Sequence, residues 1–162
     1  MPRVLLIGYG NTLRGDDALG PLAIERLRSL LWDAEVAETE FLSCRQLAPE
    51  LAQRLASSDL ALFVDAACDG ESGTVRVQRL SPEAGDVASF THHVKPEVLL
   101  QLAQALYGRA PQAVLVSGAG AAFESSERLS EQGQQALNEV CRRVPRMIRE
   151  FLACVTNNNI GL

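Results

Sequence analysis

The feature that most constrains this chain is a glycine-rich turn between an apolar run and an amphipathic one. Residues 4–7 (Val-Leu-Leu-Ile) are apolar, and the turn occupies residues 8–20. Apolar residues then recur at helical spacing, at Leu19, Ala23, Leu27, Leu30 and Leu31. The pattern predicts a buried strand, a tight turn and a helix over residues 18–32, which is the opening of an α/β domain.

The chemistry of the turn favours a cation over a nucleotide. Gly8 and Gly10 fit the start of a dinucleotide-binding fingerprint, but Leu13 stands where its third glycine belongs. Asp16 and Asp17 would repel a pyrophosphate. A carboxylate near a helix start can cap free N–H groups, and this explains one of the two acidic residues. The pair together favours a cation site.

The turn resembles the opening motif of the hydrogenase maturation proteases, Gly-x-Gly-Asn-x-Leu-x-x-Asp-Asp-x-x-Gly. The matching residues are Gly8, Gly10, Asn11, Leu13, Asp16, Asp17 and Gly20. Members of this family are soluble endopeptidases that trim a C-terminal extension from the large subunit of nickel–iron hydrogenases. The resemblance therefore implies a peptide hydrolase whose partner is a hydrogenase large-subunit precursor.

Composition sets the class of protein. The chain has 162 residues, 47% of them hydrophobic, so we expect one globular domain over residues 1–162 with a frayed tail at 156–162. A net charge of −5 without an evident basic cluster disfavours a nucleic-acid partner. No signal peptide and no membrane-length apolar run is present, so we expect a cytoplasmic protein without a membrane partner. Cys44, Cys68, Cys141 and Cys154 lack metal-ribbon spacing and are expected to be reduced thiols.

Periodicity predicts the other elements. Strands are expected at residues 35–42, 59–65, 74–80 and 113–120, with a loop over 43–46. Helices are expected at 50–56, from Pro96 to Tyr107, and after Ser130, which is expected to cap a long helix that Pro145 kinks or interrupts. Residues 74–80 alternate strictly, as in an edge strand, and the short link from Val64 to Thr74 is too short for a parallel crossover, so this strand is expected to be antiparallel.

This order of elements predicts a three-layer α/β/α sandwich around a mixed five-stranded sheet. The family resemblance implies a phosphorylase/hydrolase-like fold with strand order 2-1-3-5-4 and strand four antiparallel.

Three polar residues are candidates for one site. Asp17 follows strand one and Asp65 ends strand three, so the two carboxylates meet if these strands are neighbours. His92 lies in the irregular loop after strand four. Two carboxylates and an imidazole suit Ni²⁺ or Zn²⁺ with open positions.

The resemblance implies the same Asp17, Asp65 and His92 as catalytic and metal-binding residues. It favours His92 over His93 because Thr91 precedes it, as the family pattern requires.

The resemblance also implies that nickel is supplied by the substrate, with zinc or cadmium able to occupy the same site. Two mechanisms stay open: the three residues hold a metal ion that activates water, or they contact nickel already in the substrate. Residues 42–47 (Leu-Ser-Cys-Arg-Gln-Leu) resemble the branch that serves bidirectional, NAD-linked hydrogenases.

Simpler interpretations remain. Asp65 could cap a turn, His92 and His93 could be a solvated pair, and Cys68 could be a nucleophile, although such a cysteine is more often buried packing. A non-enzymatic, nickel-dependent checkpoint that holds the precursor is the main functional alternative. A peptidyl-tRNA hydrolase also opens with Gly-x-Gly-Asn, but it would need an early histidine and a basic groove, and here the first histidine is His92.

Overall fold

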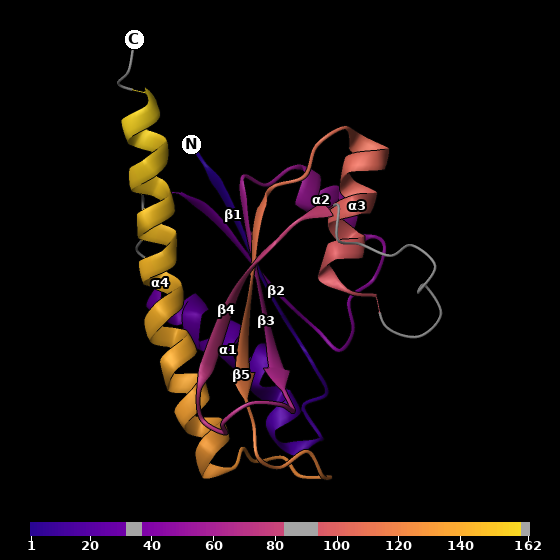
Figure 1. Cartoon of the computed structure of the whole chain (residues 1–162), viewed down its shortest axis with the longest axis vertical. Helices are drawn as coiled ribbons and strands as arrows, with labels where there is room; N and C mark the ends of the chain where they lie inside the picture. The colour runs from indigo at the N-terminus through magenta and orange to yellow at the C-terminus, as the bar shows by residue number, and fades with distance from the viewer. Residues whose placement is uncertain (32–36, 83–93, 160–162) are drawn as a thin grey trace.

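The computed structural model describes residues 1–31, 37–82 and 94–159 (Figure 1). The strands are β1 (Arg3–Tyr9), β2 (Glu38–Cys44), β3 (Leu60–Ala67), β4 (Val75–Leu80) and β5 (Gln112–Ala119). The helices are the 3-10 turn η1 (Gly15–Ala18), α1 (Leu19–Leu30), α2 (Leu51–Ala56), α3 (Pro96–Tyr107) and α4 (Glu131–Asn159). None of the described helices is long and apolar enough to cross a membrane.

The five strands form one sheet in the order β2-β1-β3-β5-β4. β1 pairs in parallel with β2 and with β3, and β3 pairs in parallel with β5. β4 pairs antiparallel with β5 at one edge of the sheet. The predicted fold class, strand order and antiparallel edge strand are confirmed.

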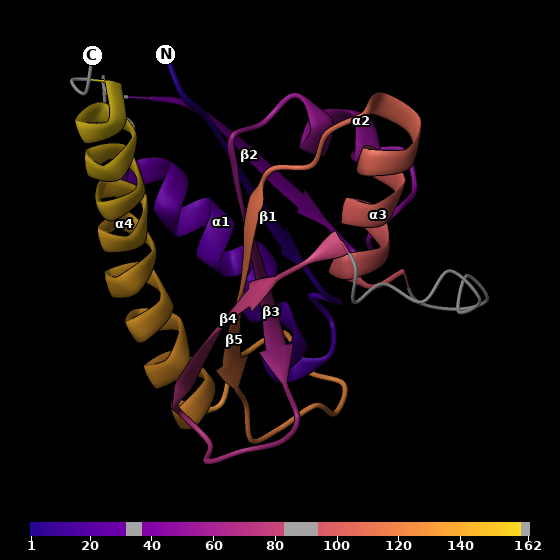
Figure 2. The same cartoon turned by 45° about the horizontal axis from the view of Figure 1, so that its top comes forward.

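Helices cover both faces of the sheet, as Figures 1 and 2 show: α1 and α4 lie on one side and α2 and α3 on the other. Successive side chains of a strand point to opposite faces, so Val4 and Leu6 belong to the core under α1 and α4. Leu5 and Ile7 belong to the core under α2 and α3. Both faces of β1 are therefore buried, which explains its unbroken apolar run.

Gly20 lets α1 approach the sheet closely. A Cβ atom at this position would lie 2.5 Å from the Tyr9 carbonyl oxygen and 2.6 Å from that of Val64. The close helix–strand contact that Leu13 cannot make is thus made seven residues further along, at Gly20. This contact fixes where the loop between β1 and α1 runs, and that loop carries Asp17.

Several boundaries differ from those predicted. β2 includes Cys44, so the loop expected at residues 43–46 starts later. α4 is a single helix that continues past Pro145 and through most of the expected frayed tail. Ser130 does cap α4, since its hydroxyl accepts a hydrogen bond from the Gly133 N–H at 2.9 Å.

Candidate active site

Asp17 is presented by the turn between β1 and α1. It lies in η1 and is half-buried. Its carboxylate accepts a hydrogen bond from the backbone N–H of Asn11 at 2.7 Å. The Asn11 side chain in turn accepts a hydrogen bond from the Leu13 N–H at 3.0 Å. The loop thereby holds the Asp17 side chain toward the end of β1.

Asp65 lies on β3, on the face that α2 and α3 cover. Ala61 and Phe63, at the same alternation on β3, belong to the core of that face. The Asp65 carboxylate accepts a hydrogen bond from the Ala66 N–H at 2.7 Å and one from the side chain of Tyr9. Tyr9 lies beside Asp65 because the parallel pairing of β1 with β3 sets Gly8 opposite Val64, one step earlier.

Burial and charge perturb both groups. Burial raises the pKa of Asp65 to about 6, and the nearby charge of Asp17 adds to the increase against the two hydrogen bonds. Burial likewise raises the pKa of the Tyr9 hydroxyl, with the Asp65 charge as the next cause. A shift of this kind marks a carboxylate kept out of water beside another acidic group, which is typical of functional sites.

Asp17 and Asp65 line the same cleft, of about 350 Å³. Its walls come from the loop after β1, the loop after β2 and the start of α3. Three cationic side chains also line it, one from each wall: Arg14, Arg45 and Lys95. The cleft therefore combines two inner carboxylates with basic groups around them.

The predicted histidine ligands, His92 and His93, lie outside the described residues. The chain resumes at Val94, and Val94, Lys95 and Pro96 all line the cleft that holds the two carboxylates. Within residues 1–31, 37–82 and 94–159 no group of three or more His, Cys, Asp or Glu could hold a metal ion. The described part thus supplies two oxygen donors, and a third ligand would have to come from elsewhere.

Asp16 does not cap a helix start, the role that the sequence suggested for one of the two aspartates. It is fully buried, at 0% exposure, and makes no capping bond to η1. Its carboxylate accepts hydrogen bonds from the N–H groups of Ala121 (2.7 Å), Ala122 (3.0 Å) and Ser130 (2.8 Å) and from the Ser130 hydroxyl (2.6 Å). Burial alone would raise the pKa of Asp16, but these bonds hold it below its usual value.

Sequence reasoning missed Asp16 as an anchor and Tyr9 as the partner of Asp65. Gly133 was a sequence signal for the Asp16 anchor, because a glycine inside a helix often marks a place where another part of the protein packs closely against the helix. A Cβ atom at Gly133 would collide with the Asp16 carboxylate. No local pattern identifies Tyr9, whose contact with Asp65 depends on strand register.

The other candidate sites, Cys68 and a second hollow, offer fewer reactive groups than the cleft. Cys68 is exposed, so its expected role as buried packing is wrong, and all four cysteines are free. A larger hollow of about 600 Å³ lies at the opposite ends of β1 and β2. The acidic groups on its lining form ion pairs, Glu38 with Arg3 and Glu40 with Arg54. It therefore lacks the unpaired carboxylates of the cleft.

The fold is similar to those of several solved protein structures. No family model and no curated protein matches the sequence. A NiFe hydrogenase maturation protease (HycI) from Thermococcus kodakarensis KOD1 superposes with a TM-score of 0.68 at 26% identity, covering 93% of this chain and 92% of that one. An endopeptidase from Escherichia coli superposes with a TM-score of 0.70 at 25% identity, covering 91% and 93%.

The hydrogenase maturating endopeptidase HybD from E. coli shares the fold with a TM-score of 0.65 at 22% identity, covering 93% of each chain. Besides this fold, the chain has the glycine and aspartate motif in its first turn and a cleft lined by Asp17 and Asp65. The chain is therefore similar, in its fold and in the motif of its first turn, to hydrogenase maturation proteases.

Proposed function

We propose that this protein is an endopeptidase that removes the C-terminal extension of a nickel-loaded large-subunit precursor of a NiFe hydrogenase. The observation that carries the proposal is the pairing of Asp17 and Asp65 in one cleft beside the start of α3. The segment with His92 leads directly into that start. Similarity to solved hydrogenase maturation proteases supports the reaction type, and the paired carboxylates support recognition of a cation.

The residues present fit a divalent metal ion. The charge of Asp17 helps to raise the pKa of Asp65, so the two carboxylates repel each other when both are ionised. A cation between them would relieve this repulsion. His92 would add a nitrogen donor to these oxygens, a set that suits nickel and also zinc or cadmium. In our proposal the nickel arrives as part of the substrate, and contact with it positions the precursor for cleavage. A metal ion in such a site can polarise a carbonyl group or lower the pKa of bound water.

The protein's own groups hold the site in place before the substrate arrives. The Asn11 N–H orients Asp17, while the Ala66 N–H and the Tyr9 side chain orient Asp65. Such preorganisation lowers the cost of placing the scissile peptide. In the reaction, water adds to the peptide carbonyl carbon and the C–N bond breaks. The products are a new carboxylate on the mature subunit and an amine on the released extension.

The cleft wall formed by the loop after β2 supports a more specific class of precursor as the substrate. Arg45, Gln46 and Leu47 line the cleft and belong to the segment that resembles the branch for bidirectional, NAD-linked hydrogenases. A substitution in this wall changes what a bound precursor contacts. We therefore propose a precursor from that branch as the substrate.

The test is to incubate the purified protein with nickel-loaded precursor and to measure the precursor's mass. We expect a loss equal to the C-terminal extension. The Asp17→Asn variant should reduce the rate by about 100-fold or more, because an amide cannot supply anionic ligation. Asp69→Asn, which changes an exposed carboxylate away from the cleft, should cleave at the wild-type rate. Stable binding of the precursor without any change in mass would instead establish the checkpoint alternative.

A further inference from the structure

Arginines gather beside the edge of the sheet in a chain whose net charge is −5. Arg142, Arg143, Arg146 and Arg149 lie within about two turns of α4. Arg79 lies on the neighbouring strand β4. The basic residues on the α4 side of this sheet edge thus come from two elements, β4 and α4, that are far apart in the sequence.

Acidic neighbours neutralise only part of this charge. Arg142 and Arg143 share Glu139, at 2.8 and 2.7 Å. Of the described residues, none forms an ion pair with Arg79, Arg146 or Arg149. The face therefore keeps an excess of positive charge.

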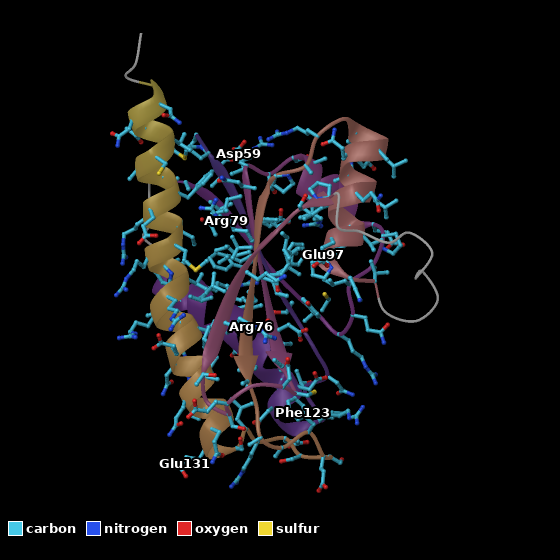
Figure 3. The ribbon with its side chains drawn as sticks, viewed as in Figure 1. Asp59, Arg76, Arg79, Glu97, Phe123 and Glu131 are labelled. Atoms are coloured by element: carbon cyan, nitrogen blue, oxygen red, sulfur yellow. The ribbon has the colours of Figure 1, made fainter. Side chains whose placement is uncertain are left out.

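A groove of about 320 Å³ runs between β4 and α4. It is lined by Val77, Glu139, Arg142, Arg143, Arg146 and Met147. Val77 is 42% exposed, although it is an apolar residue on a strand. Arg79 shares the face of β4 that carries Val77, because side chains alternate along a strand; Figure 3 labels Arg79 on the α4 side of the sheet. The groove thus offers an apolar floor beside a row of guanidinium groups.

The outer edge of β4 presents backbone groups for pairing. The Ala119 N–H donates to the Thr74 carbonyl at 2.9 Å, so Thr74 and every second residue after it pair with β5. The N–H and C=O groups of Val75, Val77 and Arg79 therefore point away from the sheet. Arg143 donates to the Val75 carbonyl at 3.5 Å, which agrees with this direction. Val77 and Arg79 remain as the pairing groups at the edge, and no described strand lies beyond β4.

We propose that the β4 edge and the α4 arginine row form a docking surface for an extended acidic segment of a partner protein. The segment adds to the sheet as a sixth strand, with backbone hydrogen bonds to Val77 and Arg79. Its alternate side chains point toward α4, and those side chains are carboxylates that meet Arg142 and Arg146. The remaining side chains face solvent.

Other occupants fit less well. A second copy of this chain, paired edge to edge, would bring its own arginines of β4 and α4 to the same basic edge, which like charge opposes. A nucleic acid would match the arginines but not the N–H and C=O groups at the edge. Charges on β4 alone would suffice to block aggregation through the edge, so that protective role does not explain the arginines of α4. The groove lies on the α4 side, whereas the cleft with Asp65 opens toward α3, so the two sites are separate.

The experiment uses the full chain labelled with ¹⁵N and a synthetic peptide of alternating threonine and glutamate as the probe. We expect saturable binding that weakens as salt is added. The amides of Val77 and Arg79 should shift and become protected from hydrogen exchange on binding. The amides of Arg76 and Gln78 should keep their protection, since they already pair with β5. Absence of saturable binding at millimolar peptide, or protection elsewhere on the molecule, overturns the proposal.

Two variants separate charge from strand pairing. Arg146→Glu should weaken binding by about tenfold or more, whereas Arg128→Glu, the same change at an exposed arginine outside the groove, should leave it within about twofold. Val77→Pro removes an outward N–H without breaking the ladder to β5, so it should abolish peptide binding while the melting temperature and circular dichroism stay unchanged. Undiminished binding by Val77→Pro, or tighter binding of single-stranded DNA than of the peptide, would show an electrostatic patch for nucleic acid and overturn strand addition.

Discussion

The N–H and the hydroxyl of Ser130 both donate hydrogen bonds to the Asp16 carboxylate, at 2.8 and 2.6 Å, across 114 residues of sequence. The same hydroxyl accepts the N–H of Gly133 and so caps α4. Asp16 therefore anchors the beginning of α4 and the loop after β5 to the turn that presents Asp17. Two adjacent aspartates thus have separate roles, one inside the protein and one in the cleft.

Replacing the buried aspartate should destabilise the fold. In Asp16→Asn an amide nitrogen faces backbone and hydroxyl donors that now lack an acceptor, which costs about 2–4 kcal/mol of unfolding free energy. The melting temperature should fall by roughly 5–15 °C for a chain of this size. Asp69→Asn, at an exposed carboxylate, is the control and should melt as the wild type does. Equal melting of the two variants would restore the simple capping role.

Precursor without nickel should remain uncut even at high protease concentration. The reason is that the cleft offers paired carboxylates that a cation would satisfy, and no orthodox nucleophile is recognisable in the sequence. Mass spectrometry of nickel-free and nickel-loaded precursor under the same conditions measures this directly. Cleavage of both at similar rates would rule out recognition of substrate nickel while leaving peptidase activity itself established.

Stability should depend on pH through Asp65. Its pKa in the folded protein, about 6, lies above the ordinary value of 3.8, so folding favours the protonated form. The folded state is therefore progressively disfavoured as pH rises from about 4 to 6, by up to about 3 kcal/mol. Asp65→Asn removes this cost, so the variant should be more stable than wild type at pH 7 and equal to it near pH 4. Denaturant unfolding across this range measures the difference.

Asp59 supplies the control of opposite sign. The backbone N–H of Arg3 and the side chain of Arg109 hold the pKa of Asp59 below its usual value. Its contribution to stability is present at neutral pH and is lost as pH falls, so Asp59→Asn should be less stable than wild type at pH 7. A loss of stability in Asp65→Asn at pH 7 would contradict the assigned burial of that carboxylate.

Metal binding should depend on pH through one histidine. Ni²⁺ or Zn²⁺ should raise the melting temperature by relieving repulsion between Asp17 and Asp65. Lowering the pH through about 6.5 should weaken this effect, because protons compete for the imidazole. His92→Ala should remove the pH dependence and His93→Ala should keep it. The reverse result would make His93 the ligand, and no metal-induced shift at all would leave only metal supplied by the substrate.

Local patterns in the sequence determined the elements and their order. α3 runs from Pro96 to Tyr107 as predicted, because proline favours a first helical turn and Gly108, at a φ of 76°, ends the helix. Strict alternation and a short link identified β4 as an antiparallel edge strand. Asp17 and Asp65 could be placed in one crevice because Asp17 follows β1 and Asp65 lies near the end of β3, its parallel neighbour. These inferences rest on backbone chemistry over a few residues.

Tertiary structure alone decided which distant groups meet. Pro145 removes one hydrogen bond from α4, yet the helix continues because Val144 and Ile148 pack into the core. Asp16 reaches Ser130, and the α4 arginines lie beside β4, only after the helices dock on the sheet. Such contacts join segments separated by scores of residues, and sequence periodicity carries no information about their register. The anchor of the active-site turn and the basic groove therefore follow from packing, whereas the elements that carry them follow from the sequence.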